Sequence, residues 1–223
     1  MLAARLSICL ALVIAMLTPT TAAAGGPPEQ QLREAAANGN AAQVTALLGQ
    51  GASIDDRDAQ GRTALLLATH HNRVQAARVL IDAGADVNAK DAIHDSPYLY
   101  AGARGYNEIL RLTLAHGADL RSTNRYGGTA LIPAAERGHV ETVRTLIAAG
   151  VAVNHINKLK WTALLEAIIL GNGGQAHTEI VRLLVKAGAD VNLADGDGVS
   201  PMQHARQRGY TQIEQILSAA GAR

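Results

Sequence analysis

The sequence predicts an all-α solenoid in which short antiparallel helices stack as repeated pairs. A segment that opens with Thr or Ser and continues with small and apolar residues begins at residues 63, 96, 129, 162 and 200. The intervals between these starts are 33, 33, 33 and 38 residues. A second segment, Gly-Ala-Asp-Val-Asn or a variant of it, begins in phase at residues 84, 117, 150 and 188. Self-similarity at this period is typical of repeat proteins, whose units bury their apolar faces against neighbouring copies.

The composition agrees with a helical core made of small aliphatic side chains. Apolar residues make up 48% of the 223 residues, but aromatic residues only 3%, and Phe is absent. This argues against an aromatic-rich β-sandwich, a disulfide scaffold and a disordered chain. The formal net charge is +1 and the basic residues are scattered, so we expect no nucleic-acid partner.

Residues 1–24 have the pattern of a cleavable secretory signal. Arg5 is the only charge there, the twelve residues from Leu6 to Leu17 are mostly apolar, and small residues end the segment. We expect cleavage after Ala24, with Ala22 as the second choice. As a helix the apolar run would rise about 18 Å, against about 30 Å for a hydrocarbon core, which disfavours an uncleaved anchor. Cys9, the only cysteine, would leave with the signal.

Export has consequences for the mature chain. Without a thiol it would have no disulfide, no Cys-bound metal and no Cys nucleophile. We expect a periplasmic or secreted monomer without stable membrane insertion. Residues 25–29 should form a flexible lead into the fold, because they combine Gly and Pro.

Each repeated segment carries signals for the start and end of helices. Its opening Ser or Thr is a good N-cap, and Pro97 and Pro201 follow at the first helical position, where Pro is tolerated. About seven residues later a residue suited to the left-handed conformation predicts a helix stop. These residues are Gly39, Asn72, Gly105, Gly138, Gly171 and Gly209. A second apolar stripe of helical period follows each stop.

The chain resembles the ankyrin repeat in three features. They are the 33-residue period, Thr-x-Leu at the start of one helix, and Gly-Ala-Asp-Val-Asn after the next helix. The resemblance covers about residues 30–220. It implies antiparallel helix pairs joined by projecting β-hairpin loops, with a concave face of loops and first helices that mostly binds proteins. On this basis residues 30–223 form one ankyrin-repeat domain. It comprises an N-terminal capping half-repeat at 30–57, units at 58–90, 91–123, 124–156 and 157–194, and a shortened C-terminal unit at 195–223.

Three departures from the repeat carry predictions of their own. The usual loop Gly is replaced by His94 and Lys160, which tolerate positive φ poorly, so we expect a different turn in those two loops. Pro133 lies inside a first helix and should remove a backbone hydrogen bond and distort the helix start. The five extra residues near 171–178 form either a tolerated surface insertion or a flexible loop that contacts a partner.

No motif in the chain predicts catalysis, a metal site or a cofactor. His70 and His71 are adjacent, so on a helix their side chains point about 100° apart and cannot chelate one ion. The Asp195-Gly196-Asp197-Gly198 run lacks the spread ligands and final Glu of a calcium loop. The Gly-rich run at 171–174 has no preceding strand and no following Gly-Lys-Ser/Thr. We therefore expect a protein that is not an enzyme.

The resemblance places candidate partner-binding residues at the loop tips and on the exposed face of each first helix. Ile93, Tyr126, Leu159 and Trp161 are conspicuous, because inter-unit loops ought to be polar. They either anchor a protein interface, as aromatic and arginine side chains often do, or cover neighbouring units. The complete candidate set is Arg62, His70, His71, Ile93, Arg104, Arg125, Tyr126, Arg137, Lys158, Leu159 and Trp161.

These observations predict a non-catalytic scaffold or adaptor in the cell envelope that recognises a partner protein through the concave face. The alternative is a secreted effector of the same fold that is directed at a host. Cell fractionation separates these two interpretations.

Overall fold

The computed structural model describes residues 26–223, and the signal predicted at 1–24 lies outside the described residues. Twelve helices make up this part of the chain, and within it no helix is long and apolar enough to span a membrane. The helices are α1 (Pro28–Asn38), α2 (Ala41–Gly49), α3 (Ala64–His70), α4 (Val74–Asp82), α5 (Pro97–Arg104), α6 (Asn107–Ala115), α7 (Leu131–Glu136), α8 (Val140–Ala148), α9 (Ala163–Ile169), α10 (Gln175–Lys186), α11 (Pro201–Gln207) and α12 (Thr211–Ala219).

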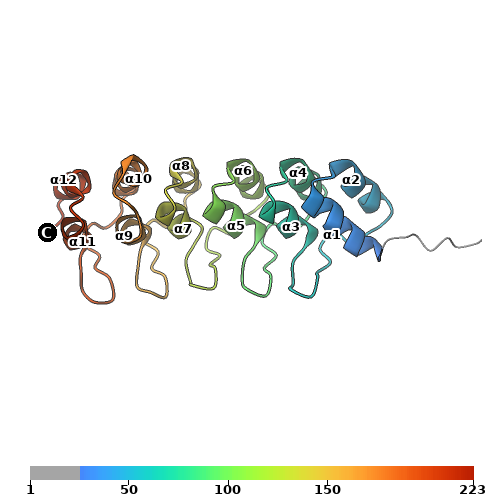
Figure 1. Ribbon diagram of the computed structural model, residues 1–223, viewed down its shortest axis with the longest axis horizontal. Helices are drawn as coiled ribbons and strands as arrows, with labels where there is room; N and C mark the ends of the chain where they lie inside the picture. The colour runs from blue at the N-terminus through green and yellow to red at the C-terminus, as the bar shows by residue number, and fades with distance from the viewer. Residues whose placement is uncertain (1–25) are drawn as a thin grey trace, which may run out of the picture.

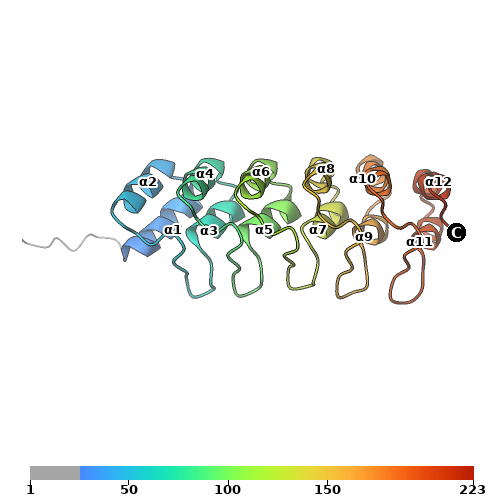
Figure 2. The same cartoon turned by 180° about the vertical axis from the view of Figure 1, so that it is seen from behind.

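The helices form an elongated stack of antiparallel pairs, which confirms the predicted solenoid. Odd-numbered helices make one layer and even-numbered helices the other, and long loops project on the side of the odd-numbered helices (Figure 1). The reverse view shows the same order of layers (Figure 2). No residue of 26–223 is assigned to a strand. The implied β-hairpins are therefore turns closed by a few backbone hydrogen bonds, such as the one from the Asp58 N–H to the Arg62 carbonyl.

The repeat places equivalent side chains one above the other in a continuous core. The third residue of each repeated segment is at most 2% exposed in every unit. These residues are Leu65, Tyr98, Leu131, Leu164 and Met202. The second helices contribute a parallel row of Leu80, Leu146, Leu184 and Leu217, all fully buried. Each short helix buries its apolar face against the other helix of its pair and against the neighbouring pairs, so the helices depend on the stack for their stability.

The predicted helix signals act as expected at most positions. The side chains of Thr63, Ser96, Thr162 and Ser200 each accept a hydrogen bond from the backbone N–H three residues later. Gly39, Gly105, Gly138 and Gly209 have positive φ, and Asn72 adopts the same conformation with φ 51°. Gly171 is the exception, because the positive φ in that unit falls on Gly173.

The prediction of a different turn at His94 and Lys160 is wrong. Their φ angles are 65° and 64°, close to the 77° of Gly61, so all these loops keep one turn. The reason is the Asp or Asn that begins each loop. Asp91, for example, accepts hydrogen bonds from the N–H groups two and four residues later, at 3.0 and 2.9 Å. These bonds hold the turn against a strain of about 1 kcal/mol at a non-Gly residue.

Pro133 distorts its helix start, as predicted. Helix α7 begins at Leu131, two residues after Thr129, and has only six residues. In α3 and α9 the capping Thr lies directly before the helix. The Thr129 hydroxyl is buried and makes no hydrogen bond. Proline has no N–H to donate to the carbonyl four residues earlier, so the first turn cannot close in the usual way.

The insertion at 171–178 is partly helical and is packed against its neighbours. The insertion extends α10 to 12 residues, against nine in α4 and α8. His177 in its first turn is buried and bonds the carbonyl of Glu136 at 2.9 Å, and the Tyr210 hydroxyl donates to the carbonyl of Gly171. The segment is therefore packed against its neighbours and is partly helical, and its contact with a partner stays a prediction.

The N-terminal end is also more regular than predicted. Helix α1 begins at Pro28, so the last two residues of the predicted lead belong to the fold. The N-terminal unit, predicted as a half-repeat at 30–57, has a complete helix pair, α1 and α2, which begins two residues earlier at Pro28. Proline at the first helical position suits this start, because its missing N–H would have no partner there.

Candidate protein-binding groove

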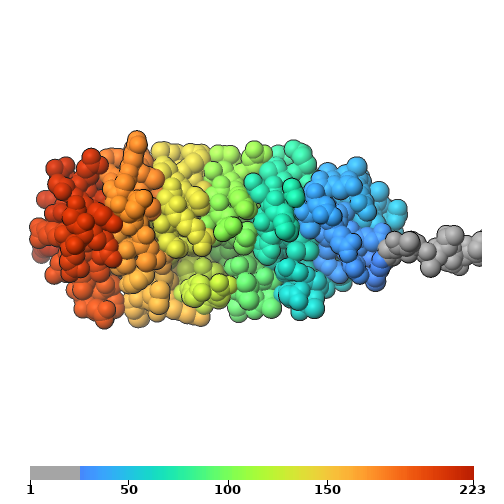
Figure 3. All heavy atoms as spheres, in the orientation of Figure 1, coloured from blue at the N-terminus to red at the C-terminus, as the bar shows by residue number. Residues whose placement is uncertain are grey.

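A groove of about 460 Å³ lies on the face made by α5, α7, α9 and the loops before them. The space-filling view shows this side of the stack, with the yellow-green atoms of the loop before α7 standing out from it (Figure 3). We call this feature the groove. Its lining residues are Asp95, Tyr100, Ala103, Arg104, Asn124, Arg125, Tyr126, Gly128, Ile132, Pro133, Glu136, Arg137, Asn157, Leu159, Glu166 and Leu170.

The position of Pro133 explains why the stack is hollow here. It occupies the repeat position held by Tyr100 one unit earlier and by Glu166 one unit later. Tyr100 and Glu166 are longer side chains that line the groove, whereas the proline ring is short. Space is therefore left over the short helix α7, between two units that fill the same position.

Apolar side chains form one wall of the groove. Tyr126 and Leu159 occupy equivalent loop positions 33 residues apart, and their exposed fractions are 55% and 54%. Leu170, at the end of α9, is 51% exposed. Ile93, at the same loop position one unit earlier, is 49% exposed and extends the row beyond the groove. About half of the surface of Ile93, Tyr126 and Leu159 is therefore accessible to a partner, and their role as interface anchors stays a prediction.

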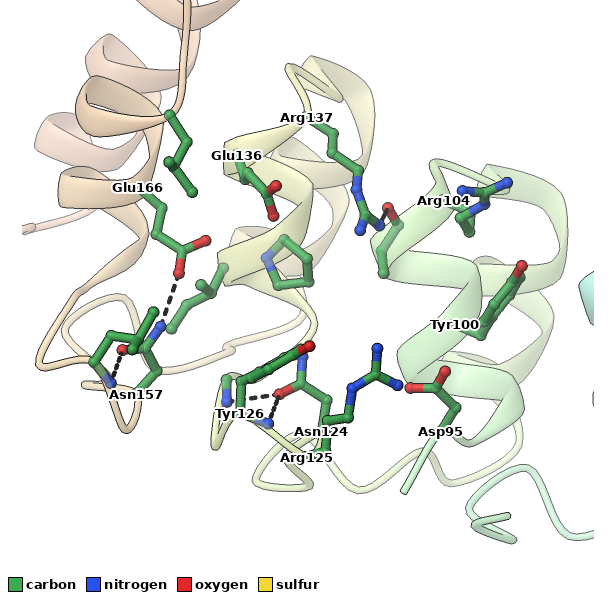
Figure 4. Close-up of a pocket in the computed structure, with 16 residues that line it drawn as sticks. Asp95, Tyr100, Arg104, Asn124, Arg125, Tyr126, Glu136, Arg137, Asn157 and Glu166 are labelled. Atoms are coloured by element: carbon green, nitrogen blue, oxygen red, sulfur yellow. Dashed lines mark hydrogen bonds between the residues drawn. The ribbon is translucent and has the colours of Figure 1, made fainter. Parts of the chain in front are cut away.

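Three arginines form the α5 side of the groove, opposite the acidic side chains Glu136 and Glu166 (Figure 4). No carboxylate of residues 26–223 lies within 4 Å of Arg104, Arg125 or Arg137. Arg137 donates to the carbonyl of Ala103 at 2.6 Å, while Arg125 lies 4.9 Å from the ring centre of Tyr126. All three arginines are exposed, so solvent can stabilise their charge without a carboxylate.

Glu166 is the buried acid of the groove, with an exposed fraction of 6%. The Asn157 side-chain amide donates to its Oε1 at 2.7 Å (Figure 4). Burial raises the pKa of Glu166 to about 7, and the nearby Glu136 carboxylate adds to the rise, while Asn157 and Arg137 oppose it. The carboxyl group therefore ionises at a higher pH than an exposed glutamate.

Asp95 is the second acid whose titration is shifted. Burial raises its pKa, with a further contribution from the charge of Asp91, and the cations Arg125 and Arg137 oppose the rise. Since Asp95 lies beside the arginines, it offsets part of their charge. The groove thus has a basic end near α5 and an acidic end between α7 and α9.

The structure brings five of the predicted binding residues together in the groove and leaves six outside it. The five are Arg104, Arg125, Tyr126, Arg137 and Leu159. Arg62 instead pairs with Asp58 at 2.7 Å, and Lys158 donates to the carbonyl of Arg125. His71 and Ile93 are exposed, and Trp161 is half-buried.

His70 also lies outside the groove and is not a solvent-facing histidine. Its ring packs 4.3 Å from that of Tyr100, and its Nε2 is buried without a hydrogen bond. Burial lowers its pKa below the usual value.

Sequence reasoning missed the acidic end of the groove. The sequence did contain a clue to it, because Glu166 is a charged residue at a helix position that Leu67 and Pro133 occupy in other units. Asn157 could be found in the same way, because it begins its loop nine residues earlier. Their hydrogen bond depends on how the loop returns to the helix, which spacing alone does not specify.

The stack of helix pairs defines a helical-repeat solenoid, with the groove on the face that carries its projecting loops. The chain belongs to the ankyrin-repeat family: the model described as ankyrin repeats in three copies matches residues 1–91 and 98–195. Ankyrin repeats are generally scaffolds for protein–protein interaction and are typically non-catalytic. Within residues 26–223 no group of three or more His, Cys, Asp and Glu side chains could hold a metal ion.

Solved structures of ankyrin-repeat proteins match nearly the whole chain. An ankyrin repeat domain from Acinetobacter baumannii AYE is 67% identical, with a TM-score of 0.85 over 86% of this chain and 98% of that one. The ankyrin repeat protein EF0377 is 44% identical, with a TM-score of 0.82 over 85% and 97%. The ankyrin repeat domain of Bcl-3, a member of the IkappaB family, is 27% identical, with a TM-score of 0.77 over 89% and 88%.

One curated relative matches a shorter stretch. The ankyrin repeat protein YahD of Escherichia coli (strain K12) is 47% identical over 57 residues. That stretch is 26% of this chain and 28% of YahD.

Proposed function

We propose that this chain is a non-catalytic scaffold of the cell envelope that holds a segment of a partner protein in the groove. The observation that carries the proposal is the exposed row of Ile93, Tyr126 and Leu159, next to three arginines that have no carboxylate of residues 26–223 within 4 Å. Exposed apolar side chains next to arginines are the composition of interface anchors. The row is continuous because each member repeats after 33 residues.

The spacing of the units suits an extended segment. Packed helices lie about 8–10 Å apart, and an extended chain rises about 3.3 Å per residue. A partner strand would therefore present every third residue to the next unit. The groove is built on helices that hold one another rigidly, so little ordering is required on binding.

The envelope location of this function rests on the composition of residues 1–24. The apolar run ending in small residues supports export and cleavage after Ala24. N-terminal sequencing of the protein recovered from its own cells, together with fractionation, tests this part separately. A mature chain that retains residues 1–24 in the cytoplasm would contradict it.

The binding function is tested by capture from the native envelope fraction with wild-type protein and the Tyr126→Ala/Leu159→Ala variant. Both side chains are more than half exposed, so the variant should keep its helical circular dichroism spectrum. We expect at least tenfold less of a specific partner on the variant. Ile156→Ala is the matched control, because Ile156 is 44% exposed and does not line the groove. Equal capture by all three proteins would refute the groove as the binding site.

A further inference from the structure

The geometry points to a basic side chain, an arginine or lysine of the partner segment, as the group bound at the α7–α9 end of the groove beside Glu166 and Glu136. This inference rests on the proposed function, since it names the chemistry of the same partner. It assigns the acidic end a ligand, whereas the proposed function uses mainly the apolar row.

The first support is the incomplete bonding of Glu166. Its Oε1 accepts the Asn157 amide, but no group of residues 26–223 donates to its Oε2, and no cationic side chain there lies within 4 Å of either oxygen. The side chain is 94% buried, yet Oε2 is not among the fully buried atoms that lack a partner. The free oxygen therefore faces the groove.

The second support is electrostatic. A buried carboxylate beside another carboxylate is unfavourable until a cation pairs with it. Figure 4 shows Glu136 and Glu166 on facing helices, with their carboxyl groups directed to the same gap between α7 and α9. The groups that bear on the charge of Glu166 are Glu136, Asn157 and Arg137, and the first makes it harder to ionise. A guanidinium or ammonium group would relieve both carboxylates at once.

The third support is the shape of the approach to the acids. Pro133, Leu159, Leu170 and the ring of Tyr126 line the groove beside them. Long basic side chains bury their methylene stems on such surfaces while the charged end reaches a polar partner.

The opposite end of the groove disfavours a basic side chain of the partner. Arg104, Arg125 and Arg137 would repel a second basic residue there. They could attract an acidic residue instead, but they are exposed, and Arg137 already has a carbonyl partner. Exposed ion pairs contribute little, so the buried acid gives the stronger preference.

The test uses the purified protein and a phage-displayed library of random peptides, selected on wild type at pH 8 and counter-selected on Tyr126→Ala/Leu159→Ala. We expect the enriched peptides to share an Arg or Lys. Their affinity should fall at least tenfold on Glu166→Gln, which keeps the shape and the oxygen that Asn157 contacts. Glu108→Gln, an exposed acid on α6, should bind as wild type. Binding to wild type should be about tenfold tighter at pH 8 than at pH 6, because Glu166 then carries its charge.

The outcomes separate this inference from the proposed function. Peptides that depend on Tyr126 and Leu159 but share an acidic residue, or no charged residue, would overturn the inference and leave the groove as a protein-binding site. Peptides with Arg or Lys that bind Glu166→Gln as tightly as wild type would also overturn it. If no peptide distinguishes wild type from the Tyr126→Ala/Leu159→Ala variant, both the inference and the proposed function fail.

Discussion

The α9–α10 and α11–α12 units place a polar pair at the same two repeat positions and use it in opposite ways. In the first, the Asn157 amide donates to Glu166 at 2.7 Å. In the second, the equivalent residues are Asp195 and His204, whose ring Nε2 lies 2.7 Å from the Asp195 carboxylate. One pair thus contains an acid without a cation, and the other contains an acid with its own basic partner.

The surroundings shift the two acids in opposite directions. Burial raises the pKa of Glu166 to about 7. Burial alone would also raise the pKa of Asp195, but hydrogen bonds from the Val199 N–H, the His204 ring and the Asp197 N–H outweigh it and hold the pKa below its usual value. The Asp195 carboxylate is therefore ionised and satisfied within its own unit.

The difference shows how a repeat can specialise without changing its backbone. At the C-terminal end the pair stabilises the unit, which has a neighbour on one side only. In the middle of the stack the same position leaves an acid partly unsatisfied in an open groove. Groups with shifted pKa values in clefts are candidates for function, and here the candidate is binding.

The largest expected effect comes from breaking the C-terminal pair with Asp195→Ala. This change removes the acceptor of two backbone N–H groups and leaves the largely buried His204 ring without its acidic partner, so we expect a loss of about 4 kcal/mol in unfolding free energy. Urea denaturation followed by circular dichroism at pH 7 measures it. Asp195→Asn keeps the acceptor oxygen and should recover more than half of the loss. Equal losses would show that the loop bonds are not what stabilises this unit.

The second test changes the acid of the groove with Glu166→Gln. In the folded chain the pKa of Glu166 is raised from 4.5 to about 7, so the folded state binds the proton more tightly. Stability from this group is present below about pH 4.5 and is lost as pH rises through about 7. The variant should exceed wild type by about 3 kcal/mol at pH 8 and match it at pH 4. If the unfolding free energies of wild type and Glu166→Gln differed by the same amount from pH 4 to pH 8, the raised pKa of Glu166 would be contradicted.

A third test addresses the joint between the two units with Gly173→Ala. The residue has φ 66°, and an added Cβ would lie 2.4 Å from the ring of Tyr210. We expect a loss of about 2 kcal/mol, from strain and from displacement of that ring. Thermal unfolding measures it. Gly49→Ala, where a Cβ would meet no atom within 4 Å, is the control and should not destabilise. A neutral Gly173→Ala would mean that the insertion does not support the last unit.

The smallest effect extends the comparison to the unit with Pro133. The Thr162 hydroxyl caps α9 by accepting from the Leu165 N–H, whereas the Thr129 hydroxyl has no hydrogen bond. Thr162→Ala and Thr129→Ala each remove one buried methyl group, so the difference between their losses of unfolding free energy measures the capping hydrogen bond. Thr162→Ala should therefore destabilise the chain by about 1 kcal/mol more than Thr129→Ala in urea denaturation. Equal losses would indicate that Thr129 caps its helix despite the proline.

Part of the groove was predictable from sequence, and part required contacts between units. The exposed loop residues Tyr126 and Leu159 were identified because apolar side chains are unexpected in polar loops. Glu166 was not, because its burial and its bond to Asn157 follow from the packing of a loop on a helix. The turns at His94 and Lys160 were mispredicted because local preference was outweighed by the side-chain oxygen that begins each loop.

From its residues alone, the chain is a stack of helix pairs with defined starts and stops. Periodic burial, capping Ser and Thr side chains and left-handed Gly residues act within a few residues of one another, so the sequence displays them directly. The groove arose only when residues 33 positions apart came into register on one face. There, the short ring of Pro133 left a hollow between longer side chains, and the burial of Glu166 made that hollow acidic at one end.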